Sequence, residues 1–314
     1  MDARKRSERE LIDLITESFT RGKDIVVGVG EDDCAVMDLG VNYLLLTTDM
    51  LHRKSDLPVR MTAHQIGWMT VAVSLSDIAS MGGRPSSFLA AIGLPDDVEL
   101  DFIRELGIGM EACACRYDVS IVGGDIDKHD ELTLVGTAIG TVDKDKLVRR
   151  KGAKVGDLLC VTGTLGDATA GLRIVLEEIE APEDVEERLL RSLFEPVPRV
   201  EEGIELSGFA TSMTDISDSL AISAHELANA GGIGFKLYED QIPILDEIKQ
   251  VSEELRKLYL YGGGDYELLF TIDPQNLNSA RSNVSFTVIG EAVAENIYLA
   301  DTNEEVGFGG YLHF

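Results

Sequence analysis

Five short segments of this chain place an aspartate at the end of an apolar or small-residue run. They are GVGEDD (28–33), LLLTTD (44–49), VSLSD (73–77), SIVGGD (120–125) and TSMTDISD (211–218). A carboxylate at the end of a buried strand or within an apolar helix costs free energy unless a positive group binds it. No matching set of lysines or arginines is interleaved with these aspartates. We therefore expect the fold to gather them around divalent cations, and several Mg²⁺ ions in one site typically hold a polyphosphate.

The charge of the chain argues against nucleic acid and membrane partners. It carries 28 Lys and Arg against 56 Asp and Glu, a net charge of −28 at pH 7, whereas nucleic acids and anionic membranes need a basic surface. No apolar run is long enough to span a bilayer. The N-terminus lacks the apolar region of a secretory signal, and the four cysteines form no CxxC pair, so we expect a cytoplasmic protein.

Helical and strand-like patterns alternate along the 314 residues, which predicts an α/β or α+β fold with two domains. The charged segment 143–157 is the boundary candidate, giving domains 1–146 and 147–314. Ser7 and Glu10 form a capping-box pattern before an opening amphipathic helix. Further helices are expected at 61–81, after Asp97, and at 167–179, 183–193 and 217–230, with strands at 24–30, 34–37, 43–49, 86–94, 120–124, 132–142, 158–163, 211–215, 233–238, 267–272, 284–290 and 296–300.

Familiar nucleotide-binding motifs are absent from the sequence. There is no G-x-x-x-x-G-K-[ST] loop, an acid replaces the third glycine of a dinucleotide fingerprint at 28–33, and no H-R-D loop is present. The five histidines share no metal-ligand spacing, and no Ser–His pairing is indicated. A phosphate site in this chain must therefore be assembled from acids, glycine-rich turns and metal ions.

Asp77 is the most informative of the aspartates. Its neighbours at helical spacing are Val73, Ser74, Ser80 and Met81, so it belongs to a small and apolar helical stretch where aspartate has poor propensity. One interpretation is that it bonds serine hydroxyls or caps a neighbouring helix. The other is a Mg²⁺ ligand, because hard cations favour carboxylate oxygen.

The remaining acidic segments have an ordinary interpretation as turns or helix caps and a functional one as metal or phosphate ligands. The residues concerned are Asp32 and Asp33 after a glycine turn; Thr47, Thr48 and Asp49 at a strand end; Gly123, Gly124 and Asp125; and Asp215, Ser217 and Asp218. Arg150 is either a phosphate partner or a solvated linker charge. We also expect the glycine-rich loops 162–167 and 261–267 to form pocket walls, the second near a substrate because of Tyr261, Asp265 and Tyr266.

These motifs resemble the thiamine-monophosphate kinase family, part of a superfamily with aminoimidazole-ribonucleotide synthetase, selenophosphate synthetase and a hydrogenase maturation factor. The resemblance runs almost end to end. It covers GVGEDDCAVM, LLTTDML, AVSLSDIASMGGRP, IVGGD, LVRRKGAKVGDLLCVTGTLGDATAGL, EPVPR, TDISDSL, GGGDYELLFT and GGYLHF.

The resemblance implies ATP-dependent phosphorylation of thiamine monophosphate by direct, Mg²⁺-dependent transfer. It implies a homodimer in which strands of the N-terminal α/β domain form a barrel across the interface, plus a C-terminal α/β domain. By motif, the ATP contacts are Gly124, Asp125, Arg150 and Ser217, and Phe308 lies against the thiamine moiety. The implied metal ligands are Asp33, Thr47, Thr48, Asp49, Asp77, Asp125, Asp215 and Asp218.

Three positions depart from the family pattern. Glu31 is inserted before the acidic pair, which leaves open whether Asp32 or Asp33 binds metal. Ser55 stands where the family has a substrate-contacting histidine, and Gly264 where it has a glutamate. An alternative is therefore another ATP-dependent enzyme of the superfamily with a different phosphate or carboxyl-type acceptor. A second alternative is an acidic metal-binding protein without activity.

Overall fold

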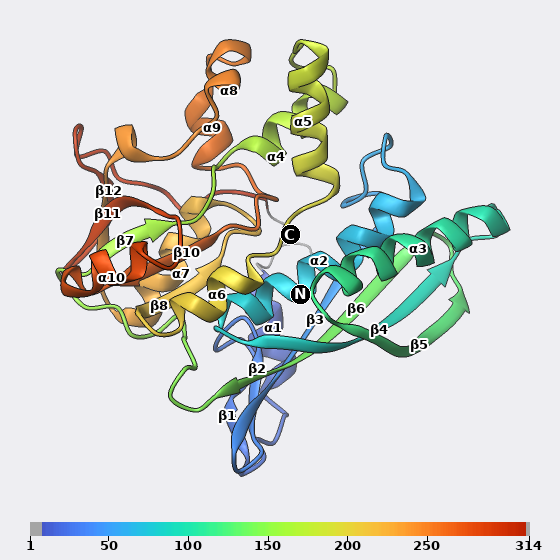
Figure 1. Cartoon of the computed structure of the whole chain (residues 1–314), viewed down its shortest axis with the longest axis horizontal. Helices are drawn as coiled ribbons and strands as arrows, with labels where there is room; N and C mark the ends of the chain where they lie inside the picture. Colours follow the sequence, from blue (N-terminus) through green and yellow to red (C-terminus); the bar gives the residue numbers. More distant parts are fainter. Residues whose placement is uncertain (1–7, 312–314) are drawn as a thin grey trace.

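The computed structural model describes residues 8–311 and contains two six-stranded sheets with helices packed on them (Figure 1). The first half consists of α1 (Glu8–Thr16), β1 (Ile25–Val27), β2 (Ala35–Asp38), β3 (Asn42–His52), α2 (Ala63–Ser80), β4 (Arg84–Leu94), α3 (Leu100–Arg116), β5 (Ser120–Lys128) and β6 (Thr133–Asp143). The second consists of β7 (Leu158–Val161), α4 (Asp167–Val175), α5 (Glu183–Phe194), α6 (Val200–Leu206), β8 (Ala210–Asp215), α7 (Leu220–Gly231), β9 (Gly234–Leu237), η2 (Glu239–Gln241), α8 (Asp246–Val251), α9 (Leu255–Tyr259), β10 (Leu268–Ile272), η3 (Pro274–Asn276), α10 (Leu277–Arg281), β11 (Thr287–Val293) and β12 (Ile297–Leu299).

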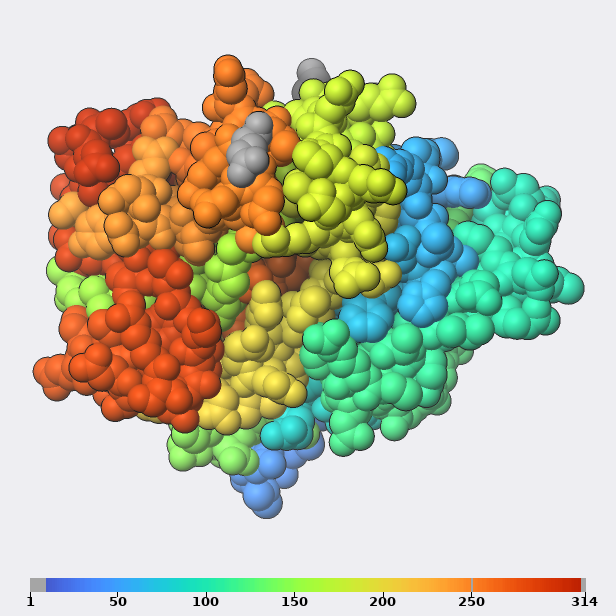
Figure 2. Space-filling model, turned by 45° about the horizontal axis from the view of Figure 1, so that its top comes forward, coloured from blue at the N-terminus to red at the C-terminus, as the bar shows by residue number. Residues whose placement is uncertain are grey.

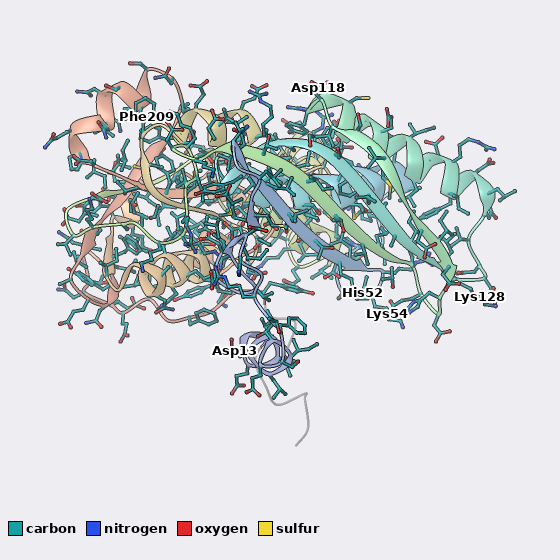
Figure 3. The ribbon with its side chains drawn as sticks, turned by 90° about the horizontal axis from the view of Figure 1, so that it is seen from below. Asp13, His52, Lys54, Asp118, Lys128 and Phe209 are labelled. Carbon is teal, nitrogen blue, oxygen red and sulfur yellow. The ribbon has the colours of Figure 1, made fainter. Side chains whose placement is uncertain are left out.

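The first sheet has the strand order β1-β2-β3-β6-β4-β5, and only β4 and β5 pair in parallel. Along β6 the burial alternates, with Leu134, Ala138 and Val142 buried towards the helices and the residues between them half-exposed. Seen from below, in Figure 3, the other face of this sheet is not covered by helices. The alternation of apolar and other residues along β6 therefore corresponds to a sheet with one packed face and one open face.

Helix α2 is the central helix of the molecule. A capping box joins Thr62 and Gln65 at its start, and thirteen of its eighteen residues are buried. It packs against α3, β3 and β6 in the first half and against α6 and β8 in the second. Because most of it is buried, its sequence is apolar or small rather than amphipathic, apart from His64, Gln65 and Asp77.

The second sheet has the order β12-β9-β11-β7-β10-β8, antiparallel except for β9 and β12. Its helices α5 and α6 contact α2, and the Trp68 indole N–H donates to the Pro196 carbonyl at 2.8 Å. Arg60 pairs with Glu186 at 2.6 Å, and Figure 2 shows the blue segment before α2 against the yellow-green α5. The two halves therefore meet along an extensive contact.

The predicted two-domain α/β class is confirmed, and the order of predicted elements is largely that of the structure. Neither sheet closes on itself within residues 8–311. The opening helix is present as α1, while Ser7 of the predicted capping box lies outside the described residues. Short helices α6, α8, α9 and α10 were not anticipated, because they are too short to show a helical period. No described helix is long and apolar enough to cross a membrane.

Gly67 of α2 and Gly109 of α3 allow these two helices to approach closely. A Cβ at Gly109 would lie 1.9 Å from the His64 carbonyl oxygen, whereas a Cβ at Gly107 in the same helix would meet nothing within 4 Å. We expect Gly109→Ala to lower the free energy of unfolding by about 1–3 kcal/mol through overpacking. Gly107→Ala is the matched control and is expected to raise it by about 0.5–1 kcal/mol, since alanine is the better helix residue. Urea unfolding of both variants tests this, and equal effects would contradict the close helix contact.

Candidate active site

Three aspartates from distant parts of the chain converge between the two halves. Asp33 precedes β2, Asp77 lies in α2 and Asp215 ends β8. One carboxylate oxygen of each lies within 4.8 Å of the others, an arrangement that fits a metal ion. We call these three residues the aspartate cluster. All three belong to the set of metal ligands that the sequence predicts.

Each member of the aspartate cluster accepts a hydrogen bond from a hydroxyl group. Thr47 donates to Asp77, Ser76 to Asp215, and Ser80 to Asp33 at 2.6 Å. Asp77 thus fits both interpretations of the sequence, since it accepts a hydrogen bond from a hydroxyl and also lies beside other carboxylates. Hydroxyl donors orient these carboxylates without neutralising them. Of the three, Asp33 also pairs with Arg150.

Burial and mutual repulsion raise the pKa values in this region. The pKa of Asp215 is raised to about 8, first by burial and then by Asp33. The pKa of Asp77 is raised well above its usual value, first by burial and then by Asp49 and Asp215. Without a cation the Asp215 carboxyl group therefore holds a proton near neutral pH. A bound divalent cation reverses this balance by favouring the ionised forms.

Asp49 supplies an independent observation that a cation would fit beside the aspartate cluster. Burial raises its pKa, and its Oδ2 atom is buried without a hydrogen-bond partner among the described residues. The neighbouring Ser74 hydroxyl lies close enough to Asp49 to lower its pKa, but within residues 8–311 it makes no hydrogen bond of normal geometry. Buried polar atoms are rarely left unpartnered. The donor set therefore fits Mg²⁺, with Asp49 beside the aspartate cluster.

The expectation that the acids lack basic partners is wrong for the pair at the 28–33 turn. Arg149 Nε donates to Asp32 at 2.9 Å, and Arg150 Nε donates to Asp33 at 2.9 Å. The sequence hides these pairs because Arg149 and Arg150 lie more than a hundred residues away. Asp33 joins the aspartate cluster, while Asp32 accepts the backbone N–H of Arg150 at 3.0 Å and is fully enclosed.

Three predicted ligands are not brought to the aspartate cluster in this chain. Thr48 lies on the opposite face of β3 from Thr47 and Asp49, and its hydroxyl donates to the Gly136 carbonyl at 2.9 Å. Gly124 and Asp125 lie on the edge strand β5, exposed to solvent. Strands β6 and β4 separate β5 from β3, a distance of about 14 Å.

A cavity of about 510 Å³ opens beside Asp49. Of the predicted site residues it includes Ser55, Ser217, Asp218 and Gly264. Its apolar walls come from both halves of the chain, with Met69 and Val73 of α2 facing Leu172 and Leu193 of α4 and α5. A small ligand in this cavity would lie with one end beside the carboxylates, since Asp49 and Asp218 both line it. We call it the inter-domain cavity.

The glycine-rich loop 261–264 forms one wall of the inter-domain cavity, as the sequence predicts. The Asp265 carboxylate holds the loop against the start of α4 by accepting the N–H groups of Gly166 at 2.8 Å and Ala168 at 3.2 Å. Gly264 has φ of +90°, and its N–H donates to the Ser217 carbonyl at 2.7 Å. Glycine at 264 thus suits a left-handed conformation that few side chains adopt.

Sequence reasoning missed a buried ion pair behind this loop. Glu267 accepts hydrogen bonds from Thr162 at 2.6 Å and from Arg199 Nε at 2.7 Å. Arg199 belongs to the EPVPR motif, which was noted only as part of the resemblance. Glu267 is a single charged residue in the otherwise apolar segment YELLF, and this could have indicated a buried partner for it.

Phe308 does not line the inter-domain cavity. Its side chain is 60% exposed, and its ring stands edge-on to His225 with centroids 5.7 Å apart. Gly310 and Tyr311 from the same segment do line the cavity. Its predicted contact with a thiamine moiety therefore stays a prediction.

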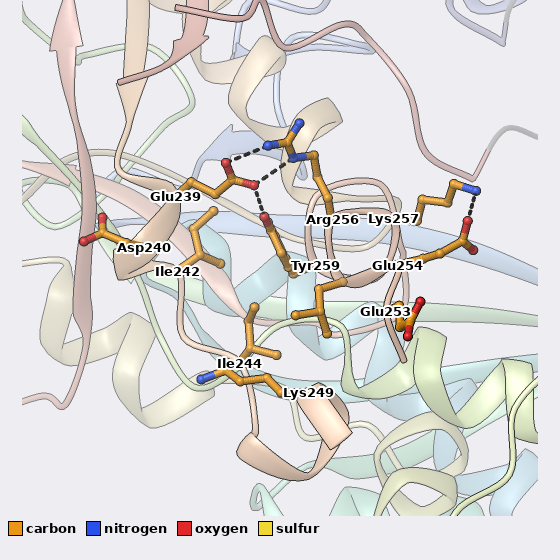
Figure 4. Close-up of a pocket in the computed structure, with 11 residues that line it drawn as sticks. Glu239, Asp240, Ile242, Ile244, Lys249, Glu253, Glu254, Arg256, Lys257 and Tyr259 are labelled. Atoms are coloured by element: carbon orange, nitrogen blue, oxygen red, sulfur yellow. Dashed lines mark hydrogen bonds and ion pairs between the residues drawn. The ribbon is translucent and has the colours of Figure 1, made fainter. Parts of the chain in front are cut away.

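A second cavity of about 680 Å³, between η2, α8 and α9, does not resemble a phosphate site (Figure 4). Arg256 pairs with Glu239 at 2.7 Å, Lys257 with Glu254, and Lys249 with Asp246 at 2.9 Å. Its cations are thus neutralised by carboxylates. The cavity also lies in the second half alone, away from the aspartate cluster.

Comparison with known proteins identifies the class of this fold and site. The family described as AIR synthase related protein matches with its N-terminal domain over residues 31–142 and its C-terminal domain over residues 154–300. The chain therefore belongs to the AIR synthase related proteins. Within them it belongs to the thiamine-monophosphate kinase family, as the following relatives show.

The thiamine-monophosphate kinase of Methanospirillum hungatei is 42% identical over 285 residues, covering 90% of this chain and 92% of the relative. That of Archaeoglobus fulgidus is 36% identical, covering 98% of each. The structure of AaThiL complexed with AMPPCP and TMP superposes with a TM-score of 0.90 at 30% identity, covering 100% of this chain and 99% of that one.

Proposed function

We propose that this chain phosphorylates thiamine monophosphate with ATP to give thiamine diphosphate. The observation that carries the proposal is the aspartate cluster at the end of a cavity lined by both domains. The full-length similarity to a protein solved with AMPPCP and TMP supports the same pair of substrates. The cavity receives the organic part of the acceptor, and its phosphate points to the carboxylates.

In this reaction the protein mainly positions the two phosphate groups and neutralises their charge. An acceptor phosphate is already an anionic nucleophile, so no general base is needed, and the described site offers no histidine for that role. Asp33, Asp49, Asp77 and Asp215 would hold Mg²⁺, with Asp218 and Thr47 beside them. When bound, Mg²⁺ neutralises the charges of two phosphate groups that must approach each other. Arg150 and Ser217 are proposed to contact ATP.

Calorimetry is the direct test of the acceptor. Thiamine monophosphate is titrated into the protein with Mg²⁺ and a non-hydrolysable ATP analogue, with thiamine as the control ligand. We expect binding of the monophosphate only, followed by formation of diphosphate and ADP when ATP is supplied. No binding at millimolar ligand would instead favour another acceptor, as Ser55 and Gly264 suggest.

We further propose that the chain is a homodimer joined through the open face of the first sheet. Leu46 and Ile139 are direct partners at the centre of that face, and Met50 on the same face of β3 is 53% exposed. Asp125 pairs in register with Ala91, which faces the same side. A second copy on this face would cover the apolar residues. It would also bring β5 of each copy, with Gly124 and Asp125, into the interface.

The dimer proposal predicts the effect of a charge at the centre of this face. We expect Ile139→Lys to give a monomer by light scattering, because a lysine buried in an apolar contact loses its hydration at a cost in free energy. Val155→Lys, at a residue 62% exposed in the linker between the sheets, is the control and should leave the dimer intact. A dimeric Ile139→Lys variant would place the interface elsewhere.

A further inference from the structure

Tyr266 has a backbone conformation that is unusual for an aromatic residue. Its φ is +51°, and the other non-glycine residues with positive φ in the described chain are Asp118, Glu177, Asn296 and Asn303. Asparagine and aspartate tolerate this region, whereas a bulky side chain there is a genuine outlier. Such a conformation persists only where the surrounding structure holds it, and it is concentrated at functional sites.

The neighbouring residues hold Tyr266 from both sides. Before it, the Asp265 carboxylate is fixed to the start of α4. After it, Glu267 is fixed to Thr162 and Arg199. The N–H of Tyr266 itself donates to the Ile216 carbonyl at 2.9 Å. The strained backbone is thus held by five hydrogen bonds, and it sets the direction of the tyrosine side chain.

That direction places the tyrosine side chain in the wall of the inter-domain cavity, which Asp49 and Asp218 also line. The ring packs against the hydrophobic core of the first domain although Tyr266 belongs to the second, and it lines the cavity. The carboxylates that act on it electrostatically are Asp49, Asp215, Asp218 and Asp77. No hydrogen bond joins its hydroxyl group to another residue of the described chain, 8–311.

We propose that Tyr266 is a substrate-contacting residue whose hydroxyl donates a hydrogen bond to a phosphate oxygen of the acceptor. This inference rests on the proposed function and names a contact that holds the acceptor phosphate. A neutral donor suits this position for a physical reason. Arg150 already pairs with Asp33 of the aspartate cluster. A second cation on the cavity side would compete further with the metal ions for the carboxylates, and another carboxylate would repel the phosphate. A phenol attracts an anionic oxygen without altering the charge of the cluster.

Tyr266→Phe isolates this contact because it keeps the ring, its packing and the backbone. Loss of a hydrogen bond to a charged group corresponds to about 10- to 100-fold in binding, so we expect the KM for thiamine monophosphate to rise by that factor. The KM for ATP and the thermal stability should stay unchanged, which a merely structural role for the residue would not produce. Tyr298→Phe on β12, outside the site, is the matched control.

The outcomes separate this inference from the proposed function. If the wild-type protein phosphorylates thiamine monophosphate and Tyr266→Phe retains its KM, the Tyr266 contact is refuted while the function stands. A KM for ATP that rises equally would also refute it, because the hydroxyl would then act on the shared metal site. If the wild-type protein does not act on thiamine monophosphate at all, both proposals are overturned.

Discussion

Asp77→Asn is expected to lower turnover by at least about 100-fold, the scale of losing one preorganised electrostatic contact in an active site. The amide keeps the size of the side chain and can still accept the Thr47 hydrogen bond, but it carries no charge to hold a cation. Because burial and neighbouring carboxylates disfavour the charged form of Asp77, the variant should fold at least as stably as the wild type in the absence of Mg²⁺. Steady-state kinetics and thermal unfolding together test both parts.

The control for Asp77→Asn is Asp301→Asn, which removes an exposed carboxylate far from the cavity. It should leave both turnover and stability unchanged. Near-normal turnover of Asp77→Asn at ordinary Mg²⁺ concentrations would show that this carboxylate is not a metal ligand. Lost turnover accompanied by unfolding would assign Asp77 a structural role instead.

The affinity for Mg²⁺ is expected to rise with pH between pH 6 and pH 8. If the metal displaces one proton, the rise is about tenfold per pH unit, or about 100-fold over this range. The reason is that the pKa of Asp215 is raised to about 8, so the metal must displace a proton below that pH. Calorimetry in buffers of different ionisation heat measures both the affinity and the protons released. Asp215→Asn should flatten the profile, and a pH-independent affinity of the wild type would contradict the assignment.

The thermal stability of the metal-free protein is expected to fall as the pH rises, whereas its affinity for Mg²⁺ rises. Asp215 and Asp265 both have a folded pKa of about 8, above the usual value of 3.8. A carboxyl group whose pKa is raised on folding contributes stability that is complete below its unfolded pKa and is lost as the pH rises through its folded pKa. Metal-free protein should therefore lose thermal stability between about pH 4 and pH 8. Mg²⁺ should restore it chiefly at the alkaline end, through Asp215 rather than Asp265.

Local sequence patterns were sufficient to predict most helices and strands and to indicate metal-dependent phosphate chemistry. The alternation of β6 and the apolar character of 61–81 predicted a sheet strand and a buried helix, and the structure has both. The family resemblance of the motifs is likewise confirmed by the comparisons. Asp33, Asp77 and Asp215 were among the eight metal ligands that the motifs implied, with the choice between Asp32 and Asp33 left open. The structure brings these three together, and their metal role stays a prediction.

Contacts between distant segments could not be predicted from the same patterns. Arg149 and Arg150 neutralise Asp32 and Asp33, although nothing in the 28–33 segment indicates it. The strand alternation that turns Thr47 towards Asp77 turns Thr48 away, so adjacent residues of one motif reach opposite faces. The pocket role of the 261–267 loop was foreseen, but not the backbone conformation that directs Tyr266 into the cavity.

The amino-acid sequence by itself determined the two-sheet α/β class, the acidic residues available for metal binding and the family to which the chain belongs. These follow from residue type and spacing, which act over a few neighbouring positions. Tertiary structure decided which carboxylates meet, which are paired by arginine and which side chains enter the cavity between the domains. Those outcomes depend on contacts between segments up to about two hundred residues apart, where packing of α2 between both sheets, and not local propensity, fixes the geometry.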